Sequence, residues 1–370
     1  MTPFVADPDF TLWLGDVREV LPTLEAESVD CVATSPPFYA LRDYQVDGQI
    51  GLEATPELWA AELVAVFAEC RRVLKPEGTL WIECGDSYAS QPGKGDNVPQ
   101  TKWPSITYPA GAPHQSTTLP GIKPKDLIGS PWLLAFALRA DGWWLRQAII
   151  WHKPNAMPES ATDRCTTAHS YVFLLSKQAR YWFDADAIAE TAEWARWGDQ
   201  TTPKYDGQDD KAGGWIKPRT KADLPGNRNG FRGETDLGDS TYIHQPARLV
   251  NHGNRQTNGP KTRTDERRGF DNRLDRDDGR KNPRSVWTIP TKGTPEAHFA
   301  TWPEALVDRI IRAGCPEGGT VLDPFLGSGT TSLVARRLGR RSIGIELNEQ
   351  YAQLAAKRLQ QLSLLAEETA

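Results

Sequence analysis

The sequence lacks any apolar run approaching the ~20 residues that a membrane-spanning helix needs. Its first ten residues, MTPFVADPDF, carry neither a basic nor an apolar stretch, so we expect no secretory signal peptide. Cysteine is scarce: the five residues are odd in number, and no two of them form a Cys-x-x-Cys pair. A zinc site and a disulfide framework are therefore not expected, and a reducing cytoplasm fits best.

Positive charge is also in short supply, because the 370 residues carry a formal net charge of −5. That balance by itself argues weakly against a general nucleic-acid binder. The charge is unevenly distributed, however, since residues 241–285 contain eleven Lys/Arg against six Asp/Glu. This basic segment is either a solvated loop or a surface for phosphate groups, and charge alone leaves both interpretations open.

Apolar periodicity predicts alternating strands and helices towards both ends of the chain, which is typical of parallel β-α-β units. The expected strands are 10–16, 28–34, 79–84, 144–151, 170–176, 319–325 and 341–347, and the expected helices are 56–74, 126–140, 303–314, 330–338 and 348–362. Gly314 is predicted to cap the helix that begins at Pro303. Trp143, Trp144 and Trp151 are interpreted as core residues.

Two segments break this pattern. Residues 86–124 are dense in Pro, Gly, Ser and Thr, and they are predicted to form a long surface loop of the kind that is functional or disordered. Residues 190–285 are polar, glycine-rich and poor in Leu, Ile and Val. We interpret them as a variable insertion that is partly ordered at best.

The strongest local signal is VLDPFLGSGTT, residues 321–331, where a strand, a glycine-rich turn and a helix follow in order. Thr330 stands where a phosphate-binding P-loop needs lysine, and Ser332 stands where a dinucleotide motif has its third glycine. Acids flank the turn instead: Asp323 precedes it, and Glu346 closes the next strand. Acids without a base suit a ligand with positive charge and a ribose diol, as in S-adenosylmethionine, whose ribose hydroxyls Glu346 is placed to bind. The structural alternative is an ordinary tight turn.

A second signal is TSPPF, residues 34–38, directly after the apolar stretch VDCVA. Proline does not extend a central strand, so the strand is predicted to stop at Ser35. Pro36 and Pro37 lack N–H groups, so the turn offers hydrogen-bond acceptors and few donors. The turn is either a strand terminator with Phe38 packed in the core, or a holder for a flat substrate at the edge of the sheet.

Together the two motifs resemble those of the amino-group DNA methyltransferases, which transfer a methyl group from S-adenosylmethionine to N4 of cytosine or N6 of adenine. The order of the motifs, catalytic first and cofactor last, is similar to the family's β-type permuted arrangement. Further similar blocks are LGDVREVL, LKPEGTLWI, IIWHKPNAMPES and HFATWPEALVDRIIRAG. The resemblance implies an α/β, Rossmann-like methyltransferase fold with a mainly parallel sheet. Residues 1–189 would form its catalytic half, 190–283 an inserted target-recognition region, and 284–370 its cofactor-binding half.

The resemblance also implies roles for individual residues. The catalytic residues are expected to be Ser35, Pro36, Pro37 and Phe38. The cofactor-binding residues are expected to be Asp16, Asp323, Pro324, Phe325, Gly327, Ser328, Gly329, Thr330 and Glu346. In this scheme Asp16 reaches the adenine of the cofactor, and Phe38 stacks on a base flipped out of the duplex. The Ser35 hydroxyl and the Pro36 carbonyl accept hydrogen bonds from the amine of that base, and no metal is needed.

The catalytic turn begins with serine rather than Asp or Asn, which in this family favours N4 of cytosine over N6 of adenine. Adenine stays open as the alternative, RNA as a weaker one, and a DNA-binding regulator without catalysis as an alternative of another class. A further departure is His169-Ser170, where the family often has His-Glu. The implied partners are double-stranded DNA, contacted by residues 86–124 and 241–285, and a cognate restriction endonuclease. A homodimer stays open, no membrane is involved, and the protein would be bacterial or phage-encoded and cytoplasmic.

Overall fold

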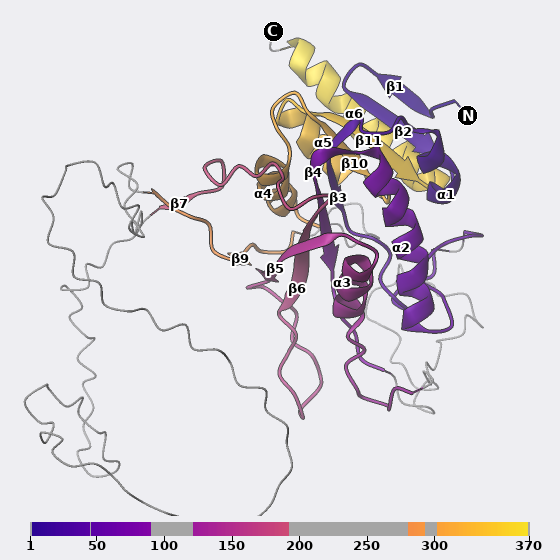
Figure 1. Cartoon of the computed structure of the whole chain (residues 1–370), viewed down its shortest axis with the longest axis vertical. Coiled ribbons are helices and arrows are strands. Elements are labelled where there is room, and N and C mark those ends of the chain that lie inside the picture. The colour runs from indigo at the N-terminus through magenta and orange to yellow at the C-terminus, as the bar shows by residue number, and fades with distance from the viewer. Residues whose placement is uncertain (1, 45, 90–120, 192–279, 293–301, 369–370) are drawn as a thin grey trace, which may run out of the picture. The chain divides into compact units, whose positions relative to one another are not determined.

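The computed structural model in Figure 1 describes residues 2–44, 46–89, 121–191, 280–292 and 302–368. The helices are α1 (Val17–Val20), the 3-10 turn η1 (Leu21–Thr23), α2 (Pro56–Val73), α3 (Ser130–Ala140), α4 (Glu304–Gly314), α5 (Thr330–Arg337) and α6 (Glu349–Glu368). The strands are β1 (Val5–Asp7), β2 (Phe10–Leu14), β3 (Val29–Thr34), β4 (Leu74–Cys84), β5 (Trp144–His152), β6 (His169–Ser176), β7 (Glu190–Thr191), β8 (Arg280–Lys281), β9 (Val286–Thr288), β10 (Thr320–Asp323) and β11 (Arg341–Glu346). No helix in these ranges is both long and apolar enough to cross a membrane.

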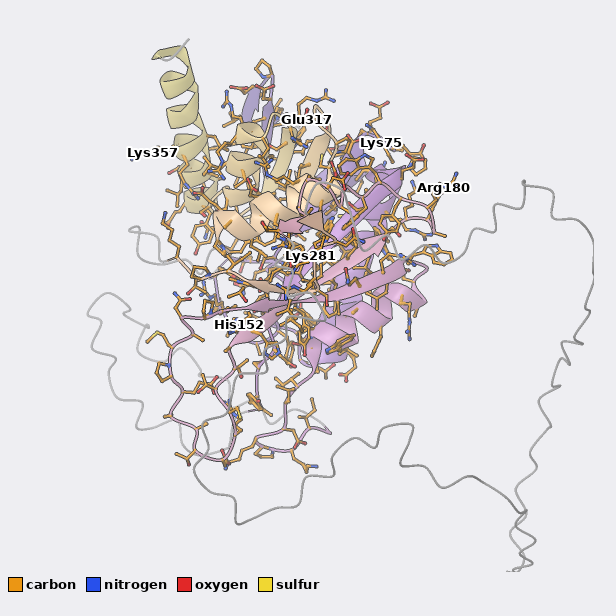
Figure 2. The ribbon with its side chains drawn as sticks, turned by 90° about the vertical axis from the view of Figure 1, so that its left-hand side faces the viewer. Lys75, His152, Arg180, Lys281, Glu317 and Lys357 are labelled. Carbon is orange, nitrogen blue, oxygen red and sulfur yellow. The ribbon has the colours of Figure 1, made fainter. Side chains whose placement is uncertain are left out.

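Most of the strands join one sheet in the order β1-β2-β11-β10-β3-β4-β6-β5-β9. Strands β2, β11, β10, β3 and β4 run parallel to one another. Strand β6 is antiparallel to both β4 and β5, and β1 is antiparallel to β2. The carboxyl ends of the parallel strands and of β5 therefore share one edge of the sheet. In Figure 2, His152 at the end of β5 lies at the opposite end of the sheet from Lys75 and Glu317, which lie at or before the starts of β4 and β10. The predicted α/β fold with a mainly parallel sheet is confirmed.

Helices cover both faces of this sheet, because each face carries large apolar side chains that must leave water. On one face α2 and α3 bury Trp59, Phe67 and Leu134 against β3, β4 and β6, and Figure 1 shows these two helices side by side. On the other face α4 and α5 pack over Trp81 and Val321. The sheet is thus the middle of three layers, and its carboxyl edge is left for the site.

Helix α3 begins at Ser130, four residues later than the expected start at 126. Gly129 adopts a left-handed conformation with φ of 78°, which a helix interior does not tolerate. The Asp86 carboxylate accepts hydrogen bonds from the backbone N–H of Gly129 at 3.0 Å and of Ser130 at 3.3 Å. A cap from a residue 43 positions away therefore sets the helix start.

Two other expectations were wrong. Gly314 is the last residue of α4 rather than a left-handed cap, and Cys315 follows it in an extended conformation. A Cβ at Gly314 would lie 2.2 Å from Nε1 of Trp81, so glycine is required there by packing. Trp144 is 49% exposed instead of buried, whereas Trp143 and Trp151 lie in the core as expected. Trp144 is the first residue of strand β5.

Strands β7 and β8 form a short antiparallel pair of their own, with Glu190 opposite Lys281. The Glu190 carboxylate also pairs with Arg284 at 2.7 Å and with Arg309 of α4 at 3.2 Å. Residues 192–279 start and finish at this pair. They lie outside the described residues, as do 90–120, so the expected loop, the basic segment and the proposed division into 1–189, 190–283 and 284–370 stay predictions.

Candidate active site

The two sequence motifs meet at the carboxyl edge of the sheet, where β3 and β10 are neighbours. The Thr34 hydroxyl donates to Oδ1 of Asp323 at 2.7 Å, across 289 positions of sequence. Two adjoining cavities open beside this contact, and both are lined by Ser35, Phe325 and Gly327. We call them the Glu346 cavity and the Phe38 cavity, because Glu346 lines only the first and Phe38 lines only the second. A ligand in one cavity would therefore lie next to a ligand in the other.

The Glu346 cavity combines two acidic side chains with apolar walls. It encloses about 690 Å³, part of which is open to solvent, and its apolar walls come from residues including Val17, Phe325 and Ile345. Among the described residues that line it, Asp16 and Glu346 are charged and none is a lysine or arginine. Such a lining suits a flat, neutral or cationic ligand and disfavours a phosphate.

Glu346 ends β11 with its carboxylate held by backbone donors. Oε2 accepts from the N–H of Gly327 at 2.7 Å, and Oε1 accepts from the N–H of Asn348 at 2.8 Å. The N–H of Leu347 also acts on this carboxylate, which has about four lone-pair sites and so keeps capacity to accept from a ligand hydroxyl. Burial raises the pKa of this carboxyl to about 7, against the opposing effect of the backbone hydrogen bonds from Asn348, Gly327 and Leu347.

Asp323 is more enclosed than the sequence suggests, being 2% exposed. Besides Thr34, its donors are the Thr331 hydroxyl at 2.5 Å and the backbone N–H of Phe325 at 3.0 Å. Burial raises its pKa to about 6 although these hydrogen bonds favour the charged form. Asp323 thus fastens the start of the glycine turn to β3, and it reaches the Phe38 cavity rather than the Glu346 cavity. Its expected contact with the cofactor stays a prediction.

The two glycines of the turn between β10 and α5 have different roles. Gly327 has φ of 56° and nothing within 4 Å of the place where a Cβ would lie, so its backbone is open to both cavities. Gly329 has φ of 83°, and a Cβ there would lie 3.0 Å from Cβ of Ala355 in α6, so it serves helix packing. Arg358 of α6 donates to the carbonyl of Ser328 at 2.6 Å and approaches Oγ1 of Thr330 at 3.4 Å.

The remaining expected cofactor residues lie along the Glu346 cavity. Pro324 and Phe325 form one wall. Asp16 caps α1 by accepting from the N–H of Arg18 at 2.8 Å, and its carboxylate pairs with the Arg18 guanidinium at 2.6 Å. Arg18 also donates to the carbonyl of Gly48 at 2.7 Å. Asp16 is thus fixed at the cavity margin, and its contact with an adenine ring stays a prediction.

Two side chains, those of Trp59 and Glu83, hydrogen-bond to the proline turn. Nε1 of Trp59 donates to the Pro37 carbonyl at 2.9 Å. The Ser35 hydroxyl donates to Oε2 of Glu83 at 2.8 Å. Pro36 and Phe38 line the Phe38 cavity together with Ser35, so the structure brings the four expected catalytic residues to one wall between the cavities, Pro37 on the side of the Glu346 cavity.

Sequence reasoning missed Glu83, which is 4% exposed near the end of β4. Burial raises the pKa of its carboxyl, against the effects of Lys153 and of hydrogen bonds from Ser35 and Ser170. The available signal was an acid within the apolar stretch TLWIEC, because a charged residue is rarely buried without a purpose. Tyr44 and Tyr351 were missed as well, and they line both cavities with their rings 6.3 Å apart.

Comparison with known proteins agrees with this arrangement. Residues 29–357 match the family model described as DNA methylase (N6_N4_Mtase). The chain is 38% identical to the type II methyltransferase M.SmaI of Serratia marcescens, over 94% of this chain and 89% of that protein. It is 37% identical to the type II methyltransferase M.Cfr9I of Citrobacter freundii, over 95% and 87%.

Among solved structures, the cytosine-N4-specific PvuII DNA methyltransferase aligns with a TM-score of 0.56 at 16% identity, covering 96% of this chain and 88% of that one, which shows a shared fold. The match to the family model and the identity with full-length relatives are sufficient to assign the family. The chain therefore belongs to the DNA methylase family and is an S-adenosylmethionine-dependent DNA methyltransferase of the class that modifies exocyclic amino groups.

Proposed function

We propose that this methyltransferase modifies N4 of cytosine in double-stranded DNA, with the flipped base in the Phe38 cavity and S-adenosylmethionine in the Glu346 cavity. Residues 190–283 would select the target sequence. The observation that carries the proposal is the hydrogen bond from Ser35 to Glu83, located where the two cavities adjoin.

The Glu346 cavity fits the donor in shape and in charge. Its apolar walls suit an adenine ring, and the acceptor capacity that the Glu346 carboxylate keeps suits a ribose hydroxyl. An acidic lining favours a ligand that carries an ammonium and a sulfonium. When bound, S-adenosylmethionine supplies a methyl group on its positively charged sulfur.

The Ser35 hydroxyl has one proton and two lone pairs. Because the proton is given to Glu83, both lone pairs are left to accept a hydrogen bond from an exocyclic amine. The lone pair of that amine is conjugated with the base ring, so acceptors aimed at its N–H bonds help it to pyramidalise towards the methyl group. The Pro36 carbonyl is the second acceptor in this scheme.

Phe38 offsets part of the cost of extracting the base. Flipping a base out of the duplex costs a few kcal/mol, and stacking on an aromatic ring returns about 1–3 kcal/mol. The ring is supported from behind, because a Cβ at Gly85 would lie 3.0 Å from its Cε2 atom. A fixed ring keeps the base in line with the neighbouring cavity, and such positioning supplies much of the rate.

Glu83 also gives the released proton a path. After methyl transfer the amine carries one proton too many, and the Ser35 hydroxyl can pass a proton to the Glu83 carboxylate in the same movement. The raised pKa of Glu83 brings the basicity of this carboxylate closer to neutral pH, where a proton acceptor works best.

The test uses labelled S-adenosylmethionine and DNA that contains the target site, followed by digestion of the product to nucleosides. We expect the label in N4-methyldeoxycytidine. Label in N6-methyldeoxyadenosine would refute the choice of base, and no transfer would favour a DNA-binding regulator. A Ser35→Ala variant is the matched control, since it should bind S-adenosylmethionine normally and transfer methyl groups at least about tenfold more slowly.

A cognate restriction endonuclease that cuts the same unmethylated site is part of the proposal, because the relatives named above are type II methyltransferases. Plasmid from cells expressing the chain should resist one such enzyme. A homodimer and a cytoplasmic location stay predictions, which sedimentation of the purified protein and cell fractionation test.

A further inference from the structure

A chain of polar groups, buried at Ser170 and half-buried at Lys153, continues from the Ser35–Glu83 pair. The Lys153 ammonium, just after β5, donates to the Ser170 hydroxyl at 2.6 Å, and Ser170 in turn hydrogen-bonds to the Glu83 carboxylate. Ser170 is 2% exposed, and Lys153 lies with its Nζ atom 4.3 Å from the centre of the Trp151 ring. The chain of donors is consistent in direction: Lys153 donates to Ser170, Ser170 donates to Glu83, and Ser35 donates to Glu83 from the other side.

We propose that Lys153 is a positioning residue for methyl transfer, which acts through Ser170 to keep the Glu83 carboxylate ionised and directed at Ser35. The inference rests on the proposed function of Ser35. An ionised Glu83 must accept the Ser35 proton, so the lone pairs of Ser35 stay turned towards the amine. A protonated Glu83 can donate to Ser35 instead, which occupies one of those lone pairs and removes the proton acceptor.

Among the described residues, Lys153 is the group whose positive charge acts on the Glu83 carboxylate. Other titratable residues adjoin this chain of groups in the sequence: Cys84 and Asp86 follow Glu83, and His169 and Tyr171 flank Ser170 on β6. His169 and Tyr171 pack on each other with their ring centres 5.3 Å apart, and Asp86 is bound to the start of α3. Position 152, the neighbour of Lys153, is a histidine whose Nδ1 lies 3.2 Å from Oγ1 of Thr288.

The charges of the pair depend on each other. Burial raises the pKa of Glu83 and lowers that of Lys153, and each group opposes the change in the other. Removal of the Lys153 charge would leave only the hydrogen bonds from Ser35 and Ser170 to oppose burial, so the pKa of Glu83 would rise further. Because activity needs ionised Glu83, the acidic limb of the rate profile would move to higher pH.

The test compares kcat against pH for the wild type and Lys153→Met, with full-length protein, saturating S-adenosylmethionine and target DNA. We expect the acidic limb to move up by about one pH unit, so that kcat on that limb falls by about tenfold at a given pH and is largely restored at pH values above the limb. Lys153→Arg should rescue the profile because it keeps the charge. Ser170→Ala, which keeps the charge but removes the link, should shift the limb by less.

Lys125→Met is the matched control, since Lys125 is 64% exposed and pairs with Asp163 outside this chain of groups. Its profile should coincide with that of the wild type. If Lys153→Met lowered kcat by the same factor at every pH, or lost affinity for S-adenosylmethionine in calorimetry, a structural role would replace the proposed one. The base that is methylated does not enter this comparison, so an adenine product would refute the proposed target and leave the pH result to decide the role of Lys153.

Discussion

The raised pKa of Glu346 makes the affinity for S-adenosylmethionine depend on pH near neutrality. In the free protein this carboxyl has a pKa of about 7, because burial disfavours its charged form. If the ribose hydroxyls donate to its oxygens, the ligand binds the ionised form and lowers the pKa in the complex. Protonation of the free protein then competes with binding. A free pKa of 7 weakens binding by a factor of about 11 at pH 6 and about 1.1 at pH 8, a tenfold difference or about 1.4 kcal/mol.

The assay is isothermal titration calorimetry of the DNA-free protein at pH 6, 7 and 8 and constant ionic strength, in two buffers of different ionisation enthalpy. We expect the dissociation constant to fall about tenfold from pH 6 to pH 8, with close to one proton released per ligand bound at pH 6. Glu346→Gln should bind S-adenosylmethionine more weakly at pH 8, and its dissociation constant should no longer change with pH. Titration of the ligand itself would instead persist in this variant. Asp323→Asn should keep the slope, since three protein donors already occupy Asp323. Equal affinity at pH 6 and pH 8, or a slope that persists in Glu346→Gln, would refute the assignment of Glu346.

Three further predictions concern packing and buried charge. Gly85→Ala would push a methyl group to 3.0 Å from the Phe38 ring, so we expect kcat/KM for DNA to fall about tenfold while calorimetry shows unchanged affinity for S-adenosylmethionine. Gly314→Ala would overlap Trp81 at 2.2 Å and should lower the free energy of unfolding by about 1–3 kcal/mol in urea titrations, at an unchanged m-value. Asp323 has a folded pKa of about 6 against 3.8 unfolded, so the native state binds more protons and stability falls as pH rises through this interval. Relative to Asp323→Asn, the wild type should therefore lose about 1–2 kcal/mol between pH 5 and pH 8, and parallel stability curves for the two proteins would contradict this.

Local patterns were enough to predict the parts of the fold that local chemistry determines. The proline turn at Ser35 and the glycine turn at Gly327 depend on residues that restrict or free the backbone, so a few letters reveal them. The alternation of apolar strands and amphipathic helices likewise predicted a mainly parallel sheet, since only that arrangement buries the continuous apolar strands on both faces.

What the sequence could not predict depends on partners distant along the chain. Glu83 looks like one acid in an apolar strand until β6 and the proline turn bring Ser170 and Ser35 to it. The start of α3 depends on Asp86, and the glycine at 314 depends on Trp81, neither of which a window of neighbouring residues contains. Neighbouring residues alone predicted a cap at Gly314 and a start of α3 at residue 126, and tertiary contacts determined a different outcome at both places.

The pairing of β7 with β8 has a consequence for how the protein can change over generations. Because the chain leaves at Thr191 and returns at Arg280, which face each other in one ladder, an excursion of any length closes on the same spot. Each doubling of its length adds only about 0.6 kcal/mol of closure entropy. The fold can therefore accept a longer or shorter segment between β7 and β8, while the ion pairs of Glu190 with Arg284 and Arg309 hold the two ends of that segment in place. If residues 190–283 select the target sequence, as we propose, new specificities would arise by replacement of this segment, with the residues around Ser35 and Glu346 unchanged.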